Sequence, residues 1–165
     1  MELYPKLLDE NLIPEVISLY RHCTNSVYID GKRSDRYITP NNGKFLLSKY
    51  THDEFKFIWD NIKDKLPGCT PIDNRILKYR TNCYIPNHID ITKEGRPETN
   101  QSLIIQLTDP SRYKGGEVIV GNELIELTPG DGLMYGYGEE HEVKKVGGER
   151  FVINIRLFRN WHQQV

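Results

Sequence analysis

Cysteine is scarce in this chain, with three residues among 165. Cys23, Cys69 and Cys83 lie far apart and form no Cys-x-x-Cys pair, which argues against a zinc ribbon and against a disulfide framework. We therefore expect reduced thiols that are buried bystanders.

Long apolar runs are missing as well. The longest extend over a few residues, far short of the roughly 20 that a membrane-spanning helix needs. The opening sequence MELYPKLLDEN lacks a basic start followed by an apolar stretch, so we expect no signal peptide. These absences predict a cytoplasmic protein.

A strong charge of either sign is also absent, because the net charge is -1 and the isoelectric point about 6.5. Composition therefore gives no bulk positive field for a phosphate backbone, although a local basic patch stays open. At 165 residues, 38% of them hydrophobic, the chain fits a single domain over 1–165.

Helical signals fall in residues 1–74, which we predict to be a helical support with a long loop. A short helix is predicted over Glu15–Cys23, opened by Pro14. A second helix begins at the capping box Thr51-His52-Asp53-Glu54, continues with apolar residues at helical spacing and stops at Pro67-Gly68. Between the helices, the loop Asn25–Lys44 is long enough to be a flap over substrate or a simple surface excursion.

Residues 75–158 are predicted to form strands, because short β-branched and aromatic runs alternate with turns such as Pro129-Gly130-Asp131-Gly132. Their even spacing predicts a mainly β fold, a barrel or jelly roll with the N-terminal helices packed on one side. The predicted strands are Ile76–Tyr84, Ser102–Leu107, Glu117–Val120, Leu124–Leu127, Leu133–Tyr137, Glu142–Val146 and Phe151–Phe158.

Three residues are candidate metal ligands. In an extended chain His88 and Asp90 point to the same side, and His141 follows after several predicted strands. Two histidines and a carboxylate on one face of an octahedron leave three positions open, as iron(II) needs to bind a bidentate oxoacid and then oxygen. A single His-x-Asp nevertheless arises easily by chance in a chain with five histidines.

The other histidines are weaker candidates. His52 also precedes acidic residues, but it opens a helix, where residues i and i+2 do not face each other and Glu54 has a capping role. His22 and His162 have no partner nearby in sequence, so we predict that both lie on the surface.

Arg150 follows His141 by nine residues, at the start of an apolar strand. A buried cation there needs an anion, and a guanidinium can bind a carboxylate in bidentate geometry. Considered alone, an arginine in a surface turn is the simpler interpretation.

The segment from Lys78 to Phe158 resembles the double-stranded β-helix core of 2-oxoglutarate/iron(II) oxygenases, specifically the prolyl-4-hydroxylase-like branch. Besides the candidate ligands, the matching pieces are Tyr79, Leu103–Leu107, Tyr113-Lys114-Gly115-Gly116-Glu117-Val118, Leu127-Thr128-Pro129-Gly130-Asp131-Gly132, His141-Glu142-Val143 and Gly148-Glu149-Arg150-Phe151.

This resemblance implies a double-stranded β-helix core over 75–158 in which His88, Asp90 and His141 bind iron(II). It also implies that Arg150 pairs with the C5 carboxylate of 2-oxoglutarate and that Tyr79 hydrogen-bonds the same co-substrate, with Tyr84 as the alternative tyrosine. Oxygen is then the second co-substrate, and ascorbate is a candidate reductant.

Arg156 departs from the prolyl-hydroxylase pattern, in which this barrel-lining position more often carries an aromatic residue. An arginine six residues after the 2-oxoglutarate arginine instead resembles the AlkB-type nucleic-acid demethylases. The Gly-Gly-Glu strand start and the His-Glu-Val segment fit the hydroxylase branch better, so Arg156 leaves the substrate open and not the chemistry.

The leading hypothesis is a dioxygenase that hydroxylates a peptidyl proline, so a protein or peptide is the expected partner; the oligomeric state is open. The alternatives within the enzyme class are a small molecule or a methylated base. A base would need stacking aromatics and a basic strip, for which the candidates are Tyr28, Arg33, Arg36 and Tyr37.

From another class, a cupin-like metal-binding barrel typically has His-x-His where this chain has His-x-Asp, and it has no need of Arg150. A catalytically silent barrel acting as an interaction module would more naturally have lost a ligand.

Overall fold

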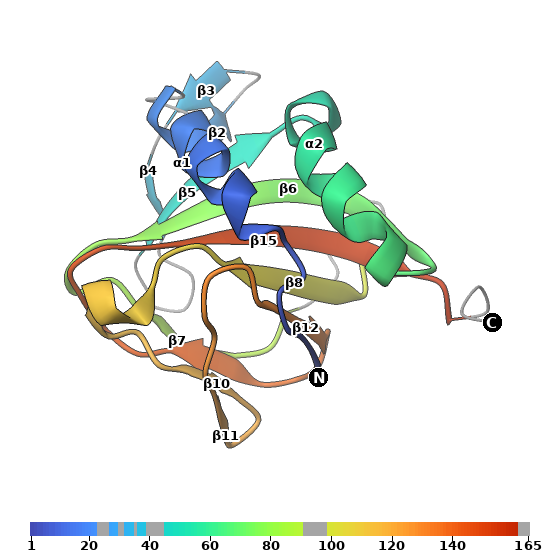
Figure 1. The fold of residues 1–165 in the computed structure, drawn as a ribbon. Helices are drawn as coiled ribbons and strands as arrows, with labels where there is room; N and C mark the ends of the chain where they lie inside the picture. The colour runs from blue at the N-terminus through green and yellow to red at the C-terminus, as the bar shows by residue number, and fades with distance from the viewer. Residues whose placement is uncertain (23–26, 30–31, 35, 39–44, 91–98, 162–165) are drawn as a thin grey trace.

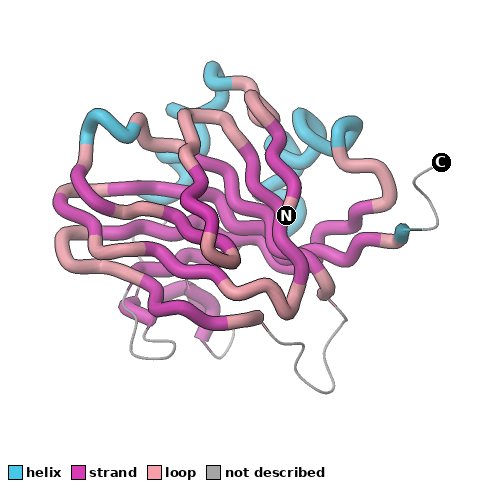
Figure 2. The backbone as a smooth tube through the Cα atoms, turned by 90° about the horizontal axis from the view of Figure 1, so that it is seen from below, coloured by secondary structure: helices cyan, strands magenta, loops and turns pink. Residues whose placement is uncertain are grey.

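Two packed β-sheets with helices on one outer face make up the architecture (Figures 1 and 2). The computed structural model describes residues 1–22, 27–29, 32–34, 36–38, 45–90 and 99–161. Among these residues every strand pairing is antiparallel. The mainly β fold with helices on one sheet is therefore confirmed.

The larger sheet has the strand order β1-β12-β8-β15-β6-β5-β4. Its strands are β1 (Glu2–Tyr4), β12 (Gly132–Gly136), β8 (Gln101–Gln106), β15 (Arg150–Arg159), β6 (Cys69–Tyr79), β5 (Phe45–Tyr50) and β4 (Arg36–Ile38). The smaller sheet is β11 (Glu123–Ile125), β10 (Val118–Val120), β13 (His141–Val143) and β7 (Ile85–His88). Two short ribbons join β14 (Val146–Gly147) to β9 (Lys114–Gly115) and β2 (Val27–Ile29) to β3 (Lys32–Ser34).

Both α-helices lie over β6 and β15 on the outer face of the larger sheet (Figure 1). They are α1 (Ile13–His22) and α2 (His52–Ile62), and short 3-10 helices span Glu10–Leu12, Lys63–Lys65 and Pro110–Arg112. The predicted capping box of α2 is confirmed, because Thr51 Oγ1 accepts from the Glu54 amide and the Glu54 carboxylate accepts from the Thr51 amide. In the described ranges no helix is both long and apolar enough to cross a membrane.

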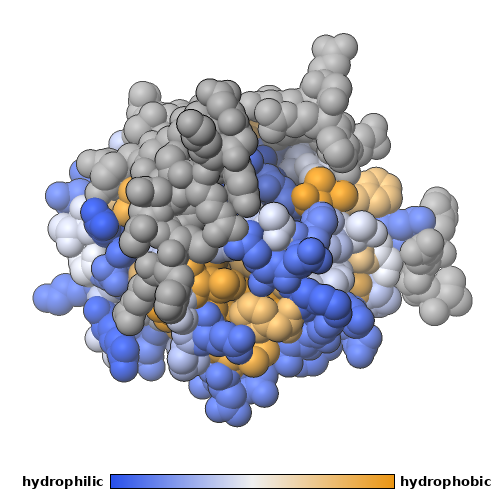
Figure 3. Space-filling model, turned by 90° about the horizontal axis from the view of Figure 1, so that it is seen from above, coloured by the Kyte–Doolittle hydropathy of each residue, from blue (hydrophilic) through white to orange (hydrophobic). Residues whose placement is uncertain are grey.

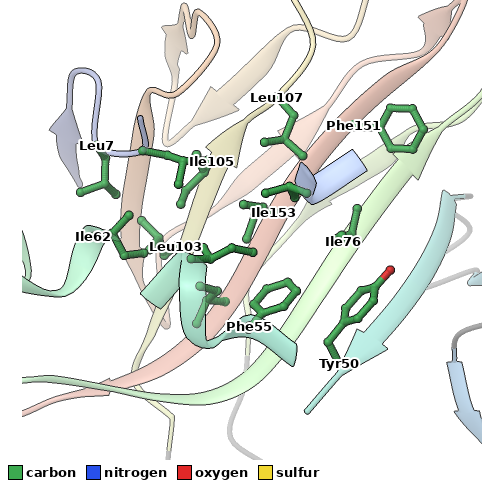
Figure 4. Close-up of a cluster of buried hydrophobic side chains, with 14 of the residues drawn as sticks. Leu7, Tyr50, Phe55, Ile62, Ile76, Leu103, Ile105, Leu107, Phe151 and Ile153 are labelled. Atoms are coloured by element: carbon green, nitrogen blue, oxygen red, sulfur yellow. The ribbon is translucent and has the colours of Figure 1, made fainter. Parts of the chain in front are cut away.

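The central strand β15 of the larger sheet is buried on both faces. Successive side chains of a strand point in opposite directions, so neighbouring residues of β15 and β6 enter two different clusters. Ile76 and Ile153 pack against Phe55 and Ile62 in a cluster beneath the helices (Figure 4). Their neighbours Leu77 and Val152 belong to a second cluster between the two sheets. Seen from the helix side, the coloured surface is hydrophilic around its edge and carries an apolar group below the centre of the view (Figure 3).

Several boundaries differ from the sequence prediction. Residues 1–74 are not only helical support, because β1, β5 and the first half of β6 belong to the larger sheet. The strand predicted over Ile76–Tyr84 ends at Tyr79, where the chain turns through Asn82 with a φ of 71° before β7. The short run of β5 carries no alternation, since its residues are buried on both faces and give no period to recognise.

The loop prediction for Asn25–Lys44 is wrong in part, because the backbone forms β2, β3 and β4 there. Residues 23–26, 30–31, 35 and 39–44 lie outside the described part. That this segment forms a flap over substrate therefore stays a prediction. That the whole chain forms a single domain stays a prediction.

The predicted turn at Pro129-Gly130-Asp131-Gly132 ties the N-terminal segment to the sheet. Gly130 has a φ of +90°, its amide donates to the Gln106 carbonyl at 2.8 Å, and its carbonyl accepts from the Leu8 amide at 3.0 Å. A β-carbon on Gly130 would lie 2.6 Å from the Leu8 carbonyl oxygen, so this close approach requires glycine.

Candidate metal and co-substrate site

The three candidate ligands converge between the sheets. The pairing of β7 with β13 places His88 directly opposite His141, and their ring centroids are 4.2 Å apart. Asp90 follows the end of β7, with Oδ1 3.3 Å from His88 Nε2 and 3.6 Å from His141 Nε2. One ligand atom from each residue lies within 4.8 Å of the others.

Backbone contacts orient the two imidazoles. His88 Nδ1 lies 2.9 Å from the Pro86 carbonyl oxygen, and His141 Nδ1 lies 3.0 Å from the Glu139 carbonyl oxygen. A carbonyl can only accept, so each Nδ1 carries a proton; in the neutral imidazole the Nε2 that faces Asp90 then keeps a free lone pair, and in the protonated form it donates to the carboxylate. The neutral form is the tautomer that a metal ligand requires.

Electrostatics favour an ionised carboxylate beside these rings. Burial raises the pKa of Asp90, but the hydrogen bond to His88 and the nearby positive groups outweigh it, so the pKa lies below its usual value. Burial lowers the pKa of His141, whereas the hydrogen bond to Asp90 raises that of His88. An anionic oxygen and two imidazole nitrogens are a donor set that suits iron(II), so the residues fit the implied metal.

A cavity of about 140 Å³ opens beside these ligands. Its floor is formed by alternate residues of β6 and β15, which face away from the helices. In β15, the alternate residues Arg150, Val152, Asn154 and Arg156 all line the cavity, as the side-chain period of an extended strand requires.

Arg150 is a buried cation and not a surface arginine, since only 1% of it is exposed. Its Nε donates to Gln106 Oε1 at 3.2 Å, while Nη1 is buried and has no hydrogen-bond partner among the described residues. A buried guanidinium with a free N–H is costly unless an anion accepts from it. The cavity therefore fits a carboxylate at Arg150.

Of the two candidate tyrosines, Tyr79 lines the cavity and Tyr84 does not. Tyr79 lines the cavity, 1% exposed, with its ring centroid 5.0 Å from Arg150 Cζ. Burial raises the pKa of Tyr79 to about 12, so its hydroxyl keeps the proton and can donate to a bound carboxylate. Tyr84 is only partly buried and is not among the residues that line the cavity.

Sequence reasoning missed two residues of the site. Gln106 is 1% exposed and holds Arg150; its polar side chain within the apolar run Ser102–Leu107 was a signal that could have been used. Tyr135 lines the cavity with its ring centroid 4.3 Å from that of His141, and burial raises the pKa of Tyr135. Nothing in the sequence distinguishes Tyr135 from an ordinary core tyrosine.

Of the other histidines, His52 has a described side chain, and it is not among the residues that line the cavity. His52 Nδ1 lies 2.9 Å from Asn74 Nδ2 at the start of α2. His162 lies outside the described residues, as do the side chains of His22, Tyr28, Arg33, Arg36 and Tyr37. Cys69 and Cys83 are free thiols, the second buried, and Cys23 is not described.

Comparison by sequence finds curated relatives that match just under half of the chain. A PKHD-type hydroxylase of Maricaulis maris is 33% identical over 87 residues, which are 48% of this chain and 40% of that protein. One of Shewanella sp. strain ANA-3 is 35% identical over 86 residues, 48% of this chain and 38% of that protein. The match thus spans about two fifths of these relatives' length, and no family model matches the chain.

Comparison by structure covers nearly the whole chain. A prolyl-4-hydroxylase from Pseudomonas putida has a TM-score of 0.69 at 13% identity, over 96% of this chain and 92% of that one. A prolyl hydroxylase from Trichoplax adhaerens, solved with a peptide fragment of the hypoxia inducible factor oxygen degradation domain, has a TM-score of 0.67 at 14% identity, over 96% and 83%. These likenesses establish the fold.

The predicted resemblance is therefore confirmed from two directions: in sequence this chain is similar to PKHD-type hydroxylases, and in fold to prolyl-4-hydroxylase-like 2-oxoglutarate/iron(II) oxygenases.

Proposed function

We propose that this chain is an iron(II)- and 2-oxoglutarate-dependent dioxygenase that hydroxylates a C–H bond of its substrate, a peptidyl proline. One observation carries the proposal: His88, Asp90 and His141 converge in the same cavity as a buried arginine that has a free N–H. Iron(II) with 2-oxoglutarate and oxygen would supply the oxidation, in which one oxygen atom enters the substrate and the other enters succinate as CO2 is released.

The chain's own residues provide binding and orientation. His88, Asp90 and His141 would hold the metal on one face, while Arg150 and Tyr79 would bind the far carboxylate of 2-oxoglutarate. Apolar side chains such as Leu77 and Val152 also line the cavity and would favour a site that is poor in water.

A cupin-like metal barrel explains this site less well. Such a barrel accounts for the metal ligands but leaves Arg150 buried with an unsatisfied N–H, which an enzyme using a dicarboxylate co-substrate would satisfy. A silent interaction module is also less favoured, because such a module has no need of a metal site and all three candidate ligands are in place.

The peptidyl-proline part of the proposal is supported by the relatives' hydroxylase names and by the peptide in the Trichoplax structure. Ascorbate as a reductant stays a prediction. The test is turnover: purified protein with iron(II), 2-oxoglutarate and oxygen should form succinate and hydroxyproline in equal amounts on proline-containing peptides. Succinate without hydroxyproline would show that peptidyl proline is not the substrate, while the 2-oxoglutarate-dependent reaction would still be supported.

The metal and co-substrate assignment is tested without turnover. Anaerobic titration of the protein with iron(II) and then 2-oxoglutarate should develop the weak visible band of the chelate. His88→Ala and Asp90→Ala should abolish the band, and Arg150→Ala should shift its appearance to higher 2-oxoglutarate concentration. His52→Ala is the matched control, because this histidine also precedes an acidic residue but lies outside the site; an equal loss of the band there would contradict the assignment.

A further inference from the structure

The cavity has a second cationic end. The register of β15 with β6 places Asn154 opposite Arg75 and Arg156 opposite Asp73. Arg75 and Arg156 both line the cavity. Arg156 lies six positions after Arg150 along β15. At about 3.3 Å per residue this separates the backbones of Arg150 and Arg156 by roughly 20 Å. A 2-oxoglutarate carboxylate that binds Arg150 is therefore too far away to bind Arg156 as well.

Positive charge exceeds negative charge at this end. Asp73 lies 2.5 Å from Arg75 Nη2 and 3.7 Å from Lys49 Nζ, so it is already shared between two cations. Burial and the neighbouring charge of Arg156 lower the pKa of Arg75, as expected for two guanidinium groups in close proximity. Glu142 also lines the cavity, but its carboxylate lies 3.1 Å from Lys144 Nζ.

Asp90 is the nearest anion to Arg156 among the described residues, and it makes no hydrogen bond to the guanidinium. Arg156 Nη2 is 4.0 Å from Asp90 Oδ1, beyond hydrogen-bond distance, and Asp90 is committed to the metal under the proposed function. Its Nε is buried without a hydrogen-bond partner in the described part of the chain. About a third of the side chain is exposed, so the group is reachable from outside.

We propose that Arg156, supported by Arg75, binds a carboxylate of the substrate and thereby positions the reacting carbon beside the metal ligands. The inference rests on the proposed function and narrows its substrate to molecules with an anionic group close to the oxidised carbon. A planar guanidinium binds a carboxylate through two parallel hydrogen bonds, which fixes orientation as well as position.

Two sources supply such a carboxylate: the free C-terminus of a peptide that ends in proline, or an acidic side chain next to the proline. A nucleic-acid phosphate is less favoured, because a net charge of -1 offers no extended positive field to hold a polyanion. The cavity of about 140 Å³ is also small beside the roughly 300–1,000 Å³ of common ligand pockets, which suits a small group.

The experiment uses the full chain loaded anaerobically with iron(II) and 2-oxoglutarate, and reads the shift of the chelate band as ligand is added. The ligands are a peptide ending in proline with a free carboxylate, the same peptide as its C-terminal amide, and an internal-proline pair flanked by Glu or by Gln. We expect one carboxylate form to bind about tenfold more tightly than its neutral match, and the pair that shows this identifies the source.

Variants assign the preference to Arg156. Arg156→Gln should remove the difference between acid and amide, and Arg156→Lys should restore part of it, while the titration with 2-oxoglutarate stays as in the unaltered chain. Arg112→Gln is the control, because Arg112 is an exposed cation outside the cavity and should leave the preference intact.

Three results would overturn the inference: equal affinities for acid and neutral ligands, a shift by none of the four, or a weaker 2-oxoglutarate titration in Arg156→Gln. The last would mean that Arg156 binds the co-substrate's metal-side carboxylate. If a single-stranded oligonucleotide shifts the band more than the peptides do, Arg156 recognises phosphate and the carboxylate proposal is wrong. Failure of the proposed function is distinct, since no band would form with iron(II) and 2-oxoglutarate alone.

Discussion

At the scale of single residues, the site depends on polar groups that satisfy one another away from water. Gln106 lies in β8, accepts from Arg150 Nε at 3.2 Å and donates to the Thr108 carbonyl at 2.7 Å and to Tyr113 Oη at 2.9 Å. These bonds fix the plane of the Gln106 amide. Arg150 is thus held in position by hydrogen bonds within the chain itself.

Gln106→Leu should weaken 2-oxoglutarate binding by about tenfold, because it removes the acceptor that orients Arg150 at little change in volume. The measurement is the anaerobic titration of the chelate band. Iron(II) affinity should be unchanged, since Gln106 touches no candidate metal ligand in the described structure. An unchanged 2-oxoglutarate titration would show that Arg150 is oriented by packing alone.

At the scale of elements, α2 shows how a local sequence signal positions a tertiary support. The capping box at Thr51 begins the helix, and Phe55, Ile58 and Ile62 then face the larger sheet. The helix covers the face of β6 and β15 that is opposite to the cavity (Figures 1 and 4). The helix therefore supports β6 and β15, the strands that carry site residues, on the face opposite to the cavity.

Thr51→Ala should lower the free energy of unfolding by about 1 kcal/mol, because the Glu54 amide loses its acceptor at the helix start. Urea denaturation followed by circular dichroism measures the change. Thr51→Ser keeps the hydroxyl and should be close to neutral. If both substitutions cost the same, the methyl group and not the cap is what stabilises the helix.

The Gly130 turn makes a second prediction at this scale. Gly130→Ala forces a β-carbon to 2.6 Å from the Leu8 carbonyl oxygen, so the N-terminal segment must shift, and we expect a loss of about 1–3 kcal/mol beyond backbone strain. Gly121→Ala is the control, with a φ of +56° and nothing within 4 Å of the added carbon. The difference in urea midpoint between the two variants isolates the close approach; equal midpoints would contradict it.

At the scale of the whole molecule, the first strand is tied to the last. β1 pairs with β12 at one edge of the larger sheet, and Glu2 Oε1 accepts from Arg159 Nη1 at 2.5 Å. Burial raises the pKa of Glu2, but the hydrogen bonds from Arg159 and Tyr4 outweigh it and leave the pKa below its usual value. Contacts between residues 157 positions apart thus contribute to a pH-dependent stability.

The sign of that dependence follows from the lowered pKa. A carboxyl group whose pKa is lower in the folded state stabilises the fold above its unfolded pKa of about 4.3, and the contribution is lost as pH falls further. Glu2→Gln should therefore destabilise the protein at pH 7, and the difference from the unaltered chain should shrink below about pH 4. Thermal unfolding at several pH values tests this, with Glu123→Gln, an exposed glutamate of β11, as control. A difference that is constant with pH would contradict it.

Strong local signals in the amino-acid sequence predict several elements correctly. The cap of α2, the turn at Gly130 and the alternation of β15 each depend on residues close together in the chain, so spacing alone predicts them. The sequence also provided the metal ligands as candidates, because His88 and Asp90 lie two residues apart. The resemblance supplied the expected roles of Arg150 and Tyr79, which stay predictions.

Which residues share the cavity depends on contacts between strands that are far apart in the sequence. Gln106 and Tyr135 reach the site through the pairing of β8 with β15 and β12, and His141 meets His88 through the pairing of β13 with β7. The burial of Arg150, which separates a binding group from a surface arginine, likewise depends on strands far apart in sequence. Antiparallel pairing sets these contacts by register, and register depends on how whole faces pack, which no local pattern records.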